Sequence, residues 1–482
     1  MISYYLEGSV VVLGLVLLML EAFLEKADKR LVGYLALAGL AGVLVASFNV
    51  DTTTSGHIFW SFYSVDKLAL FYKSLSILAT MLVIVLAIEY TPVLEKYVSP
   101  GSKQGGLGEF FCLPVFVCAG LMWMASAKEF ITIFVALETV TISFYVLVAY
   151  MRRNVGSLEA GVKYLILGAL STGFFIYGVT WVFGLTGETE LDKVGVALKA
   201  LEGCNGAALF AFTMILVGLG FKVAAVPFHI WIPDVYQGAP TPVTAFLSVG
   251  SKAAGFIVAS RILAPFLEAE QLQNSVITVL VIVTGATLLF GNLAAIPQTN
   301  FKRLLAYSSI SHSGFLLLAL CCTPDKFPME PGEVVAFYLA TYMFMTMLCF
   351  LVLVIIRRNQ ESEDMMGFQG LFQRSPFLAF ALLIGVVSLA GVPLTAGFMG
   401  KFFVFTLAVD SKQWVLLGIA VFGAACGFYY YLKVARAMFW DEPAETGAIE
   451  VSPLATVVLV LLIAATLFFG VYPAPILELL TS

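Results

Sequence analysis

The 482-residue sequence is 60% hydrophobic and only 12% charged, and its mean hydropathy is +0.97. Because soluble globular domains carry roughly twice that share of charged residues, this composition excludes a soluble protein and predicts a multi-pass membrane protein. The net charge of -5 is spread over the loops, so the sequence indicates neither nucleic acid nor an anionic lipid patch as a partner.

Apolar runs of about 18 to 25 residues predict about fourteen transmembrane helices in an all-α, polytopic membrane fold. The first run, Tyr4 to Leu24, has no basic region ahead of it and no small-residue cleavage site, so we expect it to be retained in the protein. The predicted helices start near Tyr4, Leu31, Leu68, Phe110, Phe130, Leu158, Gly206, Val243, Ser275, Phe301, Gly332, Ser375, Trp414 and Pro453.

Most lysine and arginine residues fall on one or the other side of this predicted bundle. One side carries Lys26, Lys29, Arg30, Lys96, Lys103, Arg152, Arg153, Lys302, Arg303, Arg357, Arg358, Arg374, Lys433 and Arg436. The opposite side carries roughly half as many, namely Lys67, Lys128, Lys193, Lys199, Arg261, Lys326 and Lys412. The positive-inside rule therefore predicts that the first side is cytoplasmic and that both termini lie outside.

The remaining lysines, Lys73, Lys163, Lys222, Lys252 and Lys401, fall inside apolar runs. A buried ammonium costs at least about 2.5 kcal/mol in a membrane, so such a residue is a functional hypothesis by default. Lys73 lies about two turns into its helix and could reach the interface by snorkelling.

Three acidic residues bear on this set. Glu138 is placed clearly in the middle of a span, whereas Glu89 lies near a predicted helix end. Glu159 precedes Lys163 by four residues, so these two could form a merely local helix pair.

Two predicted helices are interrupted by proline. Pro227 in AVPFHIW lies beside Lys222, and Pro393 in GVPLTAGFMGKFF lies beside Lys401, although the two lysines stand on opposite sides of their prolines in chain order. Broken backbone at membrane depth survives only where protein or a wet cavity covers it. Matching interruptions predict two inverted five-helix repeats with broken helices 7 and 12.

The repeat pattern divides the chain into four parts. They are an N-terminal three-helix segment (1–108), a first repeat of helices 4 to 8 (109–268), a second repeat of helices 9 to 13 (269–442) and a C-terminal helix 14 (443–482).

The buried charges suggest proton-transfer chemistry. If Glu138 pairs with Lys222 or Lys163, a change in that distance would weaken the hold of the lysine on its proton and drive the proton toward the next base. Lys252, His229, His312 and Lys401 are candidates to continue this relay, and the two histidines are equally well explained as ordinary buried polar groups. The seven cysteines lack metal-ligand spacing, and we expect no cofactor in this chain.

Five motifs together resemble one membrane-protein family. They are LETVTISFYVLVAY, LEAGVKYLILGALSTGFFIYG, GFKVAAVPFHIWIPDVYQGAPTPV, NFKRLLAYSSISHSGF and LAGVPLTAGFMGKFFVF. The sequence resembles the antiporter-like, proton-translocating membrane subunits of respiratory complex I over essentially its whole length, most closely the subunit N family of bacterial NADH-quinone oxidoreductase.

The resemblance implies that Glu138, Lys163, Lys222, Lys252 and Lys401 translocate protons, with uptake from the cytoplasm around Lys222 and Lys252 and release through Lys401. A lysine at position 401 is typical of subunit N, whereas subunit M is expected to have glutamate there. The resemblance also implies a bacterial inner-membrane protein whose partners are neighbouring antiporter-like and small membrane subunits and, indirectly, the peripheral redox arm. NADH, FMN, iron–sulfur clusters and quinone would be bound by other subunits, so this chain would belong to a translocating enzyme without performing redox chemistry itself.

Other functions fit the same sequence features. A Mrp-type cation/proton antiporter subunit would use similar broken helices and lysines, although the sequence lacks the extra mid-span carboxylates that sodium ions favour. The homologous subunit of a ferredoxin- or F420-linked complex or of a membrane-bound hydrogenase is a second alternative. A non-pumping structural subunit would leave the buried charges unexplained.

Overall fold

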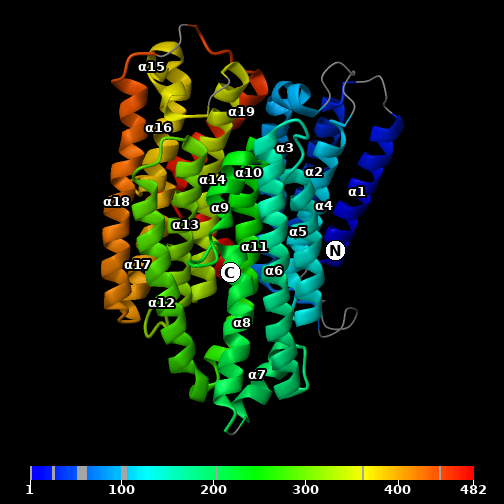
Figure 1. Cartoon of the computed structure of the whole chain (residues 1–482), viewed down its shortest axis with the longest axis vertical. Helices are drawn as coiled ribbons and strands as arrows, with labels where there is room; N and C mark the ends of the chain where they lie inside the picture. Colours follow the sequence, from blue (N-terminus) through cyan, green and yellow to red (C-terminus); the bar gives the residue numbers. More distant parts are fainter. Residues whose placement is uncertain are drawn as a thin grey trace.

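The computed structural model describes residues 3–23, 28–50, 62–98, 106–201, 203–360, 363–443 and 447–481. Within these residues the regular structure is helical and extended pairing is limited to isolated bridges, which confirms the predicted all-α fold. Figure 1 shows the long helices side by side as one bundle. Lys26 and Lys103, two of the residues used to orient the chain, lie outside the described residues.

The first part of the chain forms helices that lead up to the first break. They are α1 (Tyr4–Phe23), α2 (Arg30–Ser47), α3 (Lys67–Val98), α4 (Glu109–Ser126), α5 (Phe130–Val148), α6 (Val155–Thr186), α7 (Leu191–Lys199) and α8 (Asn205–Val223).

Between the two breaks lie α9 (Trp231–Gly238), α10 (Thr241–Phe246), the π-helical segment η1 (Leu247–Ser251), α11 (Lys252–Leu267), α12 (Glu270–Ala295), α13 (Phe301–Leu320), α14 (Pro331–Asn359), the 3₁₀ turn η2 (Met365–Phe368), α15 (Leu371–Arg374) and α16 (Pro376–Ala390). The chain ends with α17 (Ala396–Asp410), α18 (Trp414–Phe439), α19 (Pro453–Val471) and α20 (Ala474–Thr481).

A helix begins within a few residues of every predicted start. Among the described residues, 12 helices are long and apolar enough to cross a membrane, counting α10, η1 and α11 as one, while α13 and α16 fall short of that measure. The predicted number of about fourteen spans, the two inverted repeats and the division into four parts therefore stay predictions. The short helices α7, α15 and α20 were not predicted, because none is long enough to register as a span.

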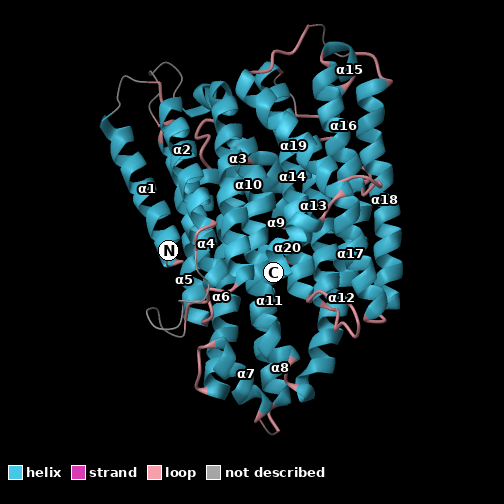
Figure 2. Ribbon diagram, turned by 180° about the vertical axis from the view of Figure 1, so that it is seen from behind, coloured by secondary structure: helices cyan, strands magenta, loops and turns pink. Residues whose placement is uncertain are grey.

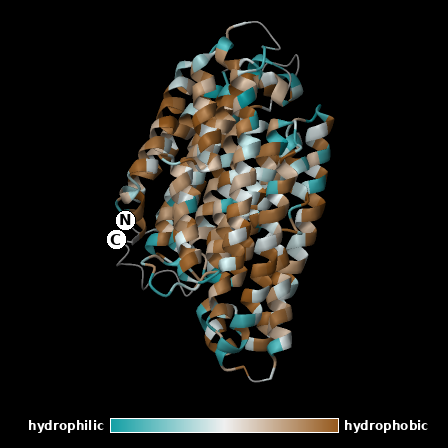
Figure 3. Cartoon of the chain, turned by 90° about the vertical axis from the view of Figure 1, so that its left-hand side faces the viewer, coloured by the Kyte–Doolittle hydropathy of each residue, from teal (hydrophilic) through white to brown (hydrophobic). Residues whose placement is uncertain are grey.

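Burial differs sharply between the helices of the bundle. The apolar window of α14 is 94% buried, whereas those of α1 and α6 are each 28% buried. Figure 3 shows apolar residues over the length of the bundle and polar residues concentrated toward its two ends. We call these ends the α15 face and the α7 face, after the short helices that mark them in Figures 1 and 2.

Both predicted helix breaks are confirmed. α8 ends at Val223, the next residue Ala224 has a left-handed φ of 68°, and α9 begins at Trp231. In the second break, α16 ends before Gly391 (φ 87°), and Leu394 (φ 72°) precedes the start of α17. Left-handed backbone cannot continue a helix, and a proline in each break reinforces the interruption. In Figure 1, α8 and α17 form the halves toward the α7 face, and α9 and α16 form the halves toward the α15 face.

Side chains satisfy backbone groups that the breaks leave free. The indole nitrogen of Trp231 donates to the Phe221 carbonyl at 3.0 Å, and the Val226 amide donates to the Thr287 hydroxyl at 2.9 Å. In the second break, the Gly397 amide donates to the Ser388 hydroxyl at 3.1 Å. Burying such groups without partners would cost several kcal/mol each, so these contacts let irregular backbone persist within the bundle.

Candidate functional site

Lys222 lies in the last turn of α8 and is only 8% exposed. Its ammonium donates a hydrogen bond to the hydroxyl of Thr141 on α5. Glu138 lies one turn earlier on α5, close enough for its charge to act on Lys222, and accepts a hydrogen bond from Thr172 at 2.8 Å. Lys222 is thus bound to α5 through Thr141, one turn from Glu138, and no direct ion pair between Lys222 and Glu138 is found among the described residues.

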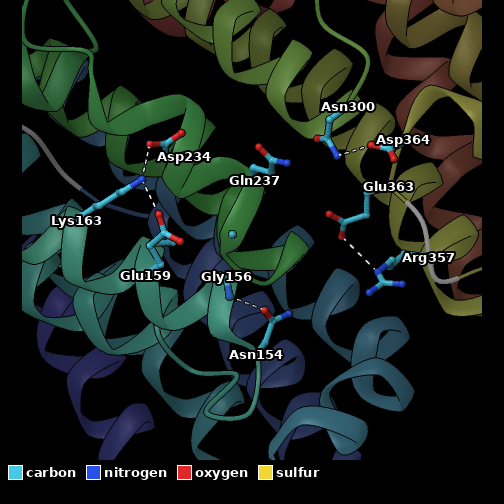
Figure 4. Close-up of a pocket in the computed structure, with 12 residues that line it drawn as sticks. Asn154, Gly156, Glu159, Lys163, Asp234, Gln237, Asn300, Arg357, Glu363 and Asp364 are labelled. Carbon is cyan, nitrogen blue, oxygen red and sulfur yellow. Dashed lines mark hydrogen bonds and ion pairs between the residues drawn. The ribbon is translucent and has the colours of Figure 1, made fainter.

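Lys163 occupies a different environment, near the α15 face. Its side chain is 41% exposed and pairs with Glu159 at 2.8 Å and with Asp234 at 2.7 Å. Asp234 belongs to α9 and also pairs with Arg303 at 2.8 Å, and Figure 4 shows Lys163 between its two carboxylates. The local pair with Glu159 is therefore present, whereas Asp234 was not singled out, although it ends the proline-rich segment after Pro227.

Lys252 is the first residue of α11, directly after the π-helical segment, and is 2% exposed. Its ammonium donates to both the carbonyl and the hydroxyl of Ser309, the former at 2.6 Å. It also lies 5.1 Å from the ring of Tyr342, within the range of a cation–π contact. Single-turn π segments occur frequently at functional sites, and neither this segment nor Ser309 was anticipated.

Lys401 lies on α17, and the C-terminus of α16, the other half of the same broken helix, binds its ammonium. Its ammonium donates to the carbonyls of Leu389 at 3.0 Å and Ala390 at 2.7 Å, the last two residues of α16. Carbonyls at a helix C-terminus lack intrahelical partners and carry partial negative charge, so they stabilise a cation there. The Lys401 side chain is otherwise buried, 5.2 Å from the ring of Phe315.

The two candidate histidines differ in their positions. His312 is buried, with Nδ1 2.7 Å from the Tyr338 hydroxyl, and its ring lies 4.9 Å from Tyr342 and 6.2 Å from Phe315. Those two rings contact Lys252 and Lys401 respectively, so His312 lies between the two lysines. His229 instead packs edge-on against Phe290 at 4.5 Å, and within the described residues its Nδ1 makes no hydrogen bond.

Three further lysines are buried in carboxylate pairs, and the first, Lys29, lies 2.7 Å from Glu21. Lys73 has a fully buried side chain that lies 2.8 Å from Glu7, so its predicted snorkelling is wrong: a partner inside the bundle holds it. Lys302, which we placed on the cytoplasmic side of the bundle, is only 1% exposed and lies 3.2 Å from Glu363. Glu89 is likewise inside α3 rather than near its end, because that helix continues to Val98.

These contacts separate the buried lysines into two groups. Lys29, Lys73 and Lys302 each have a carboxylate partner. Lys222, Lys252 and Lys401 are instead bound by hydroxyl and carbonyl oxygens, and none of the ion pairs found in the described part of the chain involves them. We call the second group, with Glu138 and His312, the central axis. A neutral oxygen stabilises an ammonium without fixing it by a full opposite charge, which suits a group that must gain and lose a proton.

The described residues contain no cluster of three or more His, Cys, Asp or Glu side chains placed to hold a metal ion. The seven cysteines are free thiols, of which five are buried, Cys204 is exposed and Cys426 is half-buried.

Comparison with known proteins agrees with this arrangement. The signature of the family described as "NADH:quinone oxidoreductase/Mrp antiporter, TM" matches residues 127–427, which include every residue of the central axis. The chain belongs to this family. Among its relatives, NADH-quinone oxidoreductase subunit N of Desulforamulus reducens is 40% identical, with 98% of this chain and 95% of that protein covered.

Solved structures of related complexes share the fold. A chain of respiratory complex I from Thermus thermophilus, with bound aureothin, is 32% identical and superposes with a TM-score of 0.80, covering 98% of each chain. A chain of an archaeal membrane-bound sulfane sulfur reductase has a TM-score of 0.85 at 23% identity, over 99% of this chain and 96% of that one. The family resemblance drawn from the sequence motifs is thus confirmed, and this antiporter-like fold recurs in complexes with different redox chemistry.

Proposed function

We propose that this chain is an antiporter-like, proton-translocating membrane subunit of a bacterial NADH-quinone oxidoreductase. Protons move through the central axis while electrons pass from NADH to quinone in other subunits, which hold the FMN and iron–sulfur clusters. Neighbouring antiporter-like and small membrane subunits are its partners in the inner membrane, and the peripheral redox arm acts on it only indirectly.

One observation carries the proposal: three buried lysines of the central axis are bound by neutral oxygens instead of carboxylates. Burying an ammonium is costly, and a purely structural role would be served better by a paired charge or an apolar residue. With Thr141, Ser309 and the end of α16 as ligands, each lysine can bind a proton and release it. A change in the distance between Glu138 and Lys222 would then alter how tightly Lys222 holds its proton.

The orientation follows from the distribution of basic residues. The α15 face, where Arg303, Arg357 and Arg374 lie, is cytoplasmic, and the α7 face is outside, with both termini on that side. Protons are taken up from the α15 face toward Lys222 and Lys252 and are released through Lys401, with His312 between the last two. Lys163 and its partners Glu159 and Asp234 lie at the uptake end of this route.

The test is NADH-driven proton pumping in membrane vesicles that carry Lys222→Ala, with quinone reduction followed in parallel. Pumping and coupled quinone reduction should both fall while the complex still assembles. Lys199→Ala is the matched control, because it removes an exposed lysine that pairs with Glu268 at the α7 face. Pumping at the wild-type rate in assembled Lys222→Ala would show that the central axis is structural.

A further inference from the structure

A chain of buried polar groups leads away from Lys252 toward the α15 face. The Ser309 hydroxyl that binds the Lys252 ammonium also lies 3.2 Å from the hydroxyl of Tyr236. Lys252, Ser309 and Tyr236 are all at most 2% exposed. These three groups therefore form one continuous hydrogen-bonded chain that solvent does not reach directly.

The outer end of this chain belongs to α9, a helix that lines a cavity at the α15 face. Tyr236 lies on α9 between Asp234 and Gln237, both of which line a cavity of about 720 Å³. Figure 4 shows Asp234 and Gln237 on one side of this cavity, and Glu363 and Arg357 on the other. The same short helix thus faces the cavity on one side and the lysine axis on the other.

An ion pair formed by the buried Lys302 and the partly buried Glu363 lies at the cavity wall. Lys302 precedes Ser309 by seven residues, so both lie on one face of α13 about 10 Å apart along the helix. The Lys302 ammonium donates to the Ala239 carbonyl at 2.7 Å and lies 3.2 Å from Glu363. Because Glu363 also lines the cavity, the ion pair links the cavity wall to the face of α13 that carries Ser309.

We propose that Tyr236 and Ser309 form the hydroxyl relay through which Lys252 receives protons from this cavity, with the Lys302–Glu363 pair at its mouth. This inference rests on the proposed function. It assigns roles to residues that the central axis does not contain. Lys302 at 3.2 Å and Arg357 at 3.5 Å fix the position of the Glu363 carboxylate at the opening, where it is placed to bind a proton that enters from the cavity.

The transfer is balanced in protons. The neutral amine of Lys252 accepts the hydroxyl proton of Ser309, Ser309 accepts the hydroxyl proton of Tyr236, and Tyr236 accepts a proton from a hydronium ion that has reached it from the cavity. Both hydroxyls end neutral, the hydronium ion becomes water, and Lys252 ends as an ammonium. Tyr236→Phe interrupts this sequence without removing either ligand of Lys252, so it separates a relay from mere positioning of the lysine.

The experiment measures NADH-driven proton pumping in vesicles that contain the assembled complex. Tyr236→Phe and Ser309→Ala should each slow pumping by about tenfold, the effect of a modest rise in the transfer barrier. Ser309→Thr keeps the hydroxyl, so this variant should pump at close to the wild-type rate. Ser76→Ala and Tyr150→Phe are matched controls, because each removes one hydroxyl that donates to a backbone carbonyl away from the central axis, Ser76 to Tyr72 and Tyr150 to Gly106.

Wild-type pumping in Tyr236→Phe would overturn the relay even if Ser309→Ala is slow, because Ser309 would then only position Lys252. If Tyr236→Phe does not assemble, Glu363→Gln takes its place, and a wild-type rate in that variant equally overturns the proposal. Lys222→Ala is measured alongside. If it abolishes pumping while Tyr236→Phe does not, the relay is wrong and the proposed function stands; if Lys222→Ala pumps normally, the proposed function itself is wrong.

Discussion

Replacing Thr141 with valine tests how a neutral oxygen controls the central lysine. The Thr141 hydroxyl donates to the Leu137 carbonyl at 2.6 Å, so its free lone pairs are available to the Lys222 ammonium. Valine keeps the shape of the side chain and removes the hydroxyl, which is both the acceptor for Lys222 and the donor to Leu137. Because the hydrogen bond is made to the charged form, its loss disfavours the ammonium and leaves the neutral amine almost unaffected.

The size of the expected pH shift follows from the free energy of a hydrogen bond to a charged group. Such a bond contributes about 1.5 to 3 kcal/mol, and about 1.4 kcal/mol corresponds to one pH unit in a proton-binding equilibrium. In Thr141→Val, Lys222 should therefore lose its proton at a pH about one to two units lower than in the wild type. If pumping requires protonated Lys222, the alkaline limit of pumping should move down by the same amount.

The assay is the pH profile of NADH-driven pumping in vesicles, with quinone reduction by an uncoupled preparation as a check on electron transfer. Thr139→Val is the matched control, since Thr139 lies on the same helix and donates only to the Val135 carbonyl of its own helix. An alkaline limit in Thr141→Val that coincides with that of Thr139→Val would refute the argument. In that case the hydroxyl does not govern the proton on Lys222.

Three further predictions concern other charged groups. Lys401→Met leaves the Leu389 and Ala390 carbonyls without their shared donor, so pumping should be lost and the midpoint of thermal unfolding should fall by an amount equivalent to about 1 to 3 kcal/mol; unchanged pumping would contradict this. Lys73→Met leaves Glu7 as a buried charge without an opposite charge and should destabilise the protein by about 3 to 5 kcal/mol. Adding Glu7→Gln should restore most of the stability without altering pumping. Equal stability of the single and double variants would show that the Lys73–Glu7 pair does not account for the loss. Burial raises the pKa of the Asp66 carboxyl, but the Arg261 charge and hydrogen bonds from Ala69 and Ser64 outweigh it and hold the pKa below its usual range. The resulting stability is present above the unfolded pKa of about 3.9 and is lost as the pH falls through the folded pKa, so Asp66→Asn should weaken the protein at pH 7 and less so in acid, as thermal unfolding at both pH values will show.

The fold was predictable where the sequence pattern reflects the membrane directly. Long apolar runs fix the position of the long helices within a few residues, because a helix must cross about 30 Å of hydrocarbon. Pro227 and Pro393 mark the two breaks, since proline removes a backbone donor wherever it stands. Charged residues inside apolar runs were equally visible, which is why Glu138, Lys222, Lys252 and Lys401 could be selected from the amino-acid pattern.

The contacts of these residues could not be predicted from the sequence. Two of the three neutral-oxygen sites include backbone carbonyls, which every residue possesses and which no pattern distinguishes. Ser309 follows Lys252 by more than fifty positions, and only the packing of α13 brings it to the ammonium. Lys302 and Arg303 were placed together on one side of the bundle, and the sequence did not distinguish them. In the structure the Lys302 side chain is buried, whereas the side chain of Arg303 is 31% exposed.

Lys222 and Lys401 stand on opposite sides of their helix breaks in chain order, yet both belong to the central axis. In chain order, Lys222 precedes its break and Lys401 follows its own, which at first weakens the likeness between the two segments. In space, α8 and α17 both occupy the halves toward the α7 face, so the two lysines stand on the same side of their breaks. If the second segment is an inverted copy, a lysine at the matching chain position would instead point to the opposite face. The difference in chain order is therefore what allows both lysines to join one axis running across the bundle rather than two separate sites facing opposite sides of the membrane.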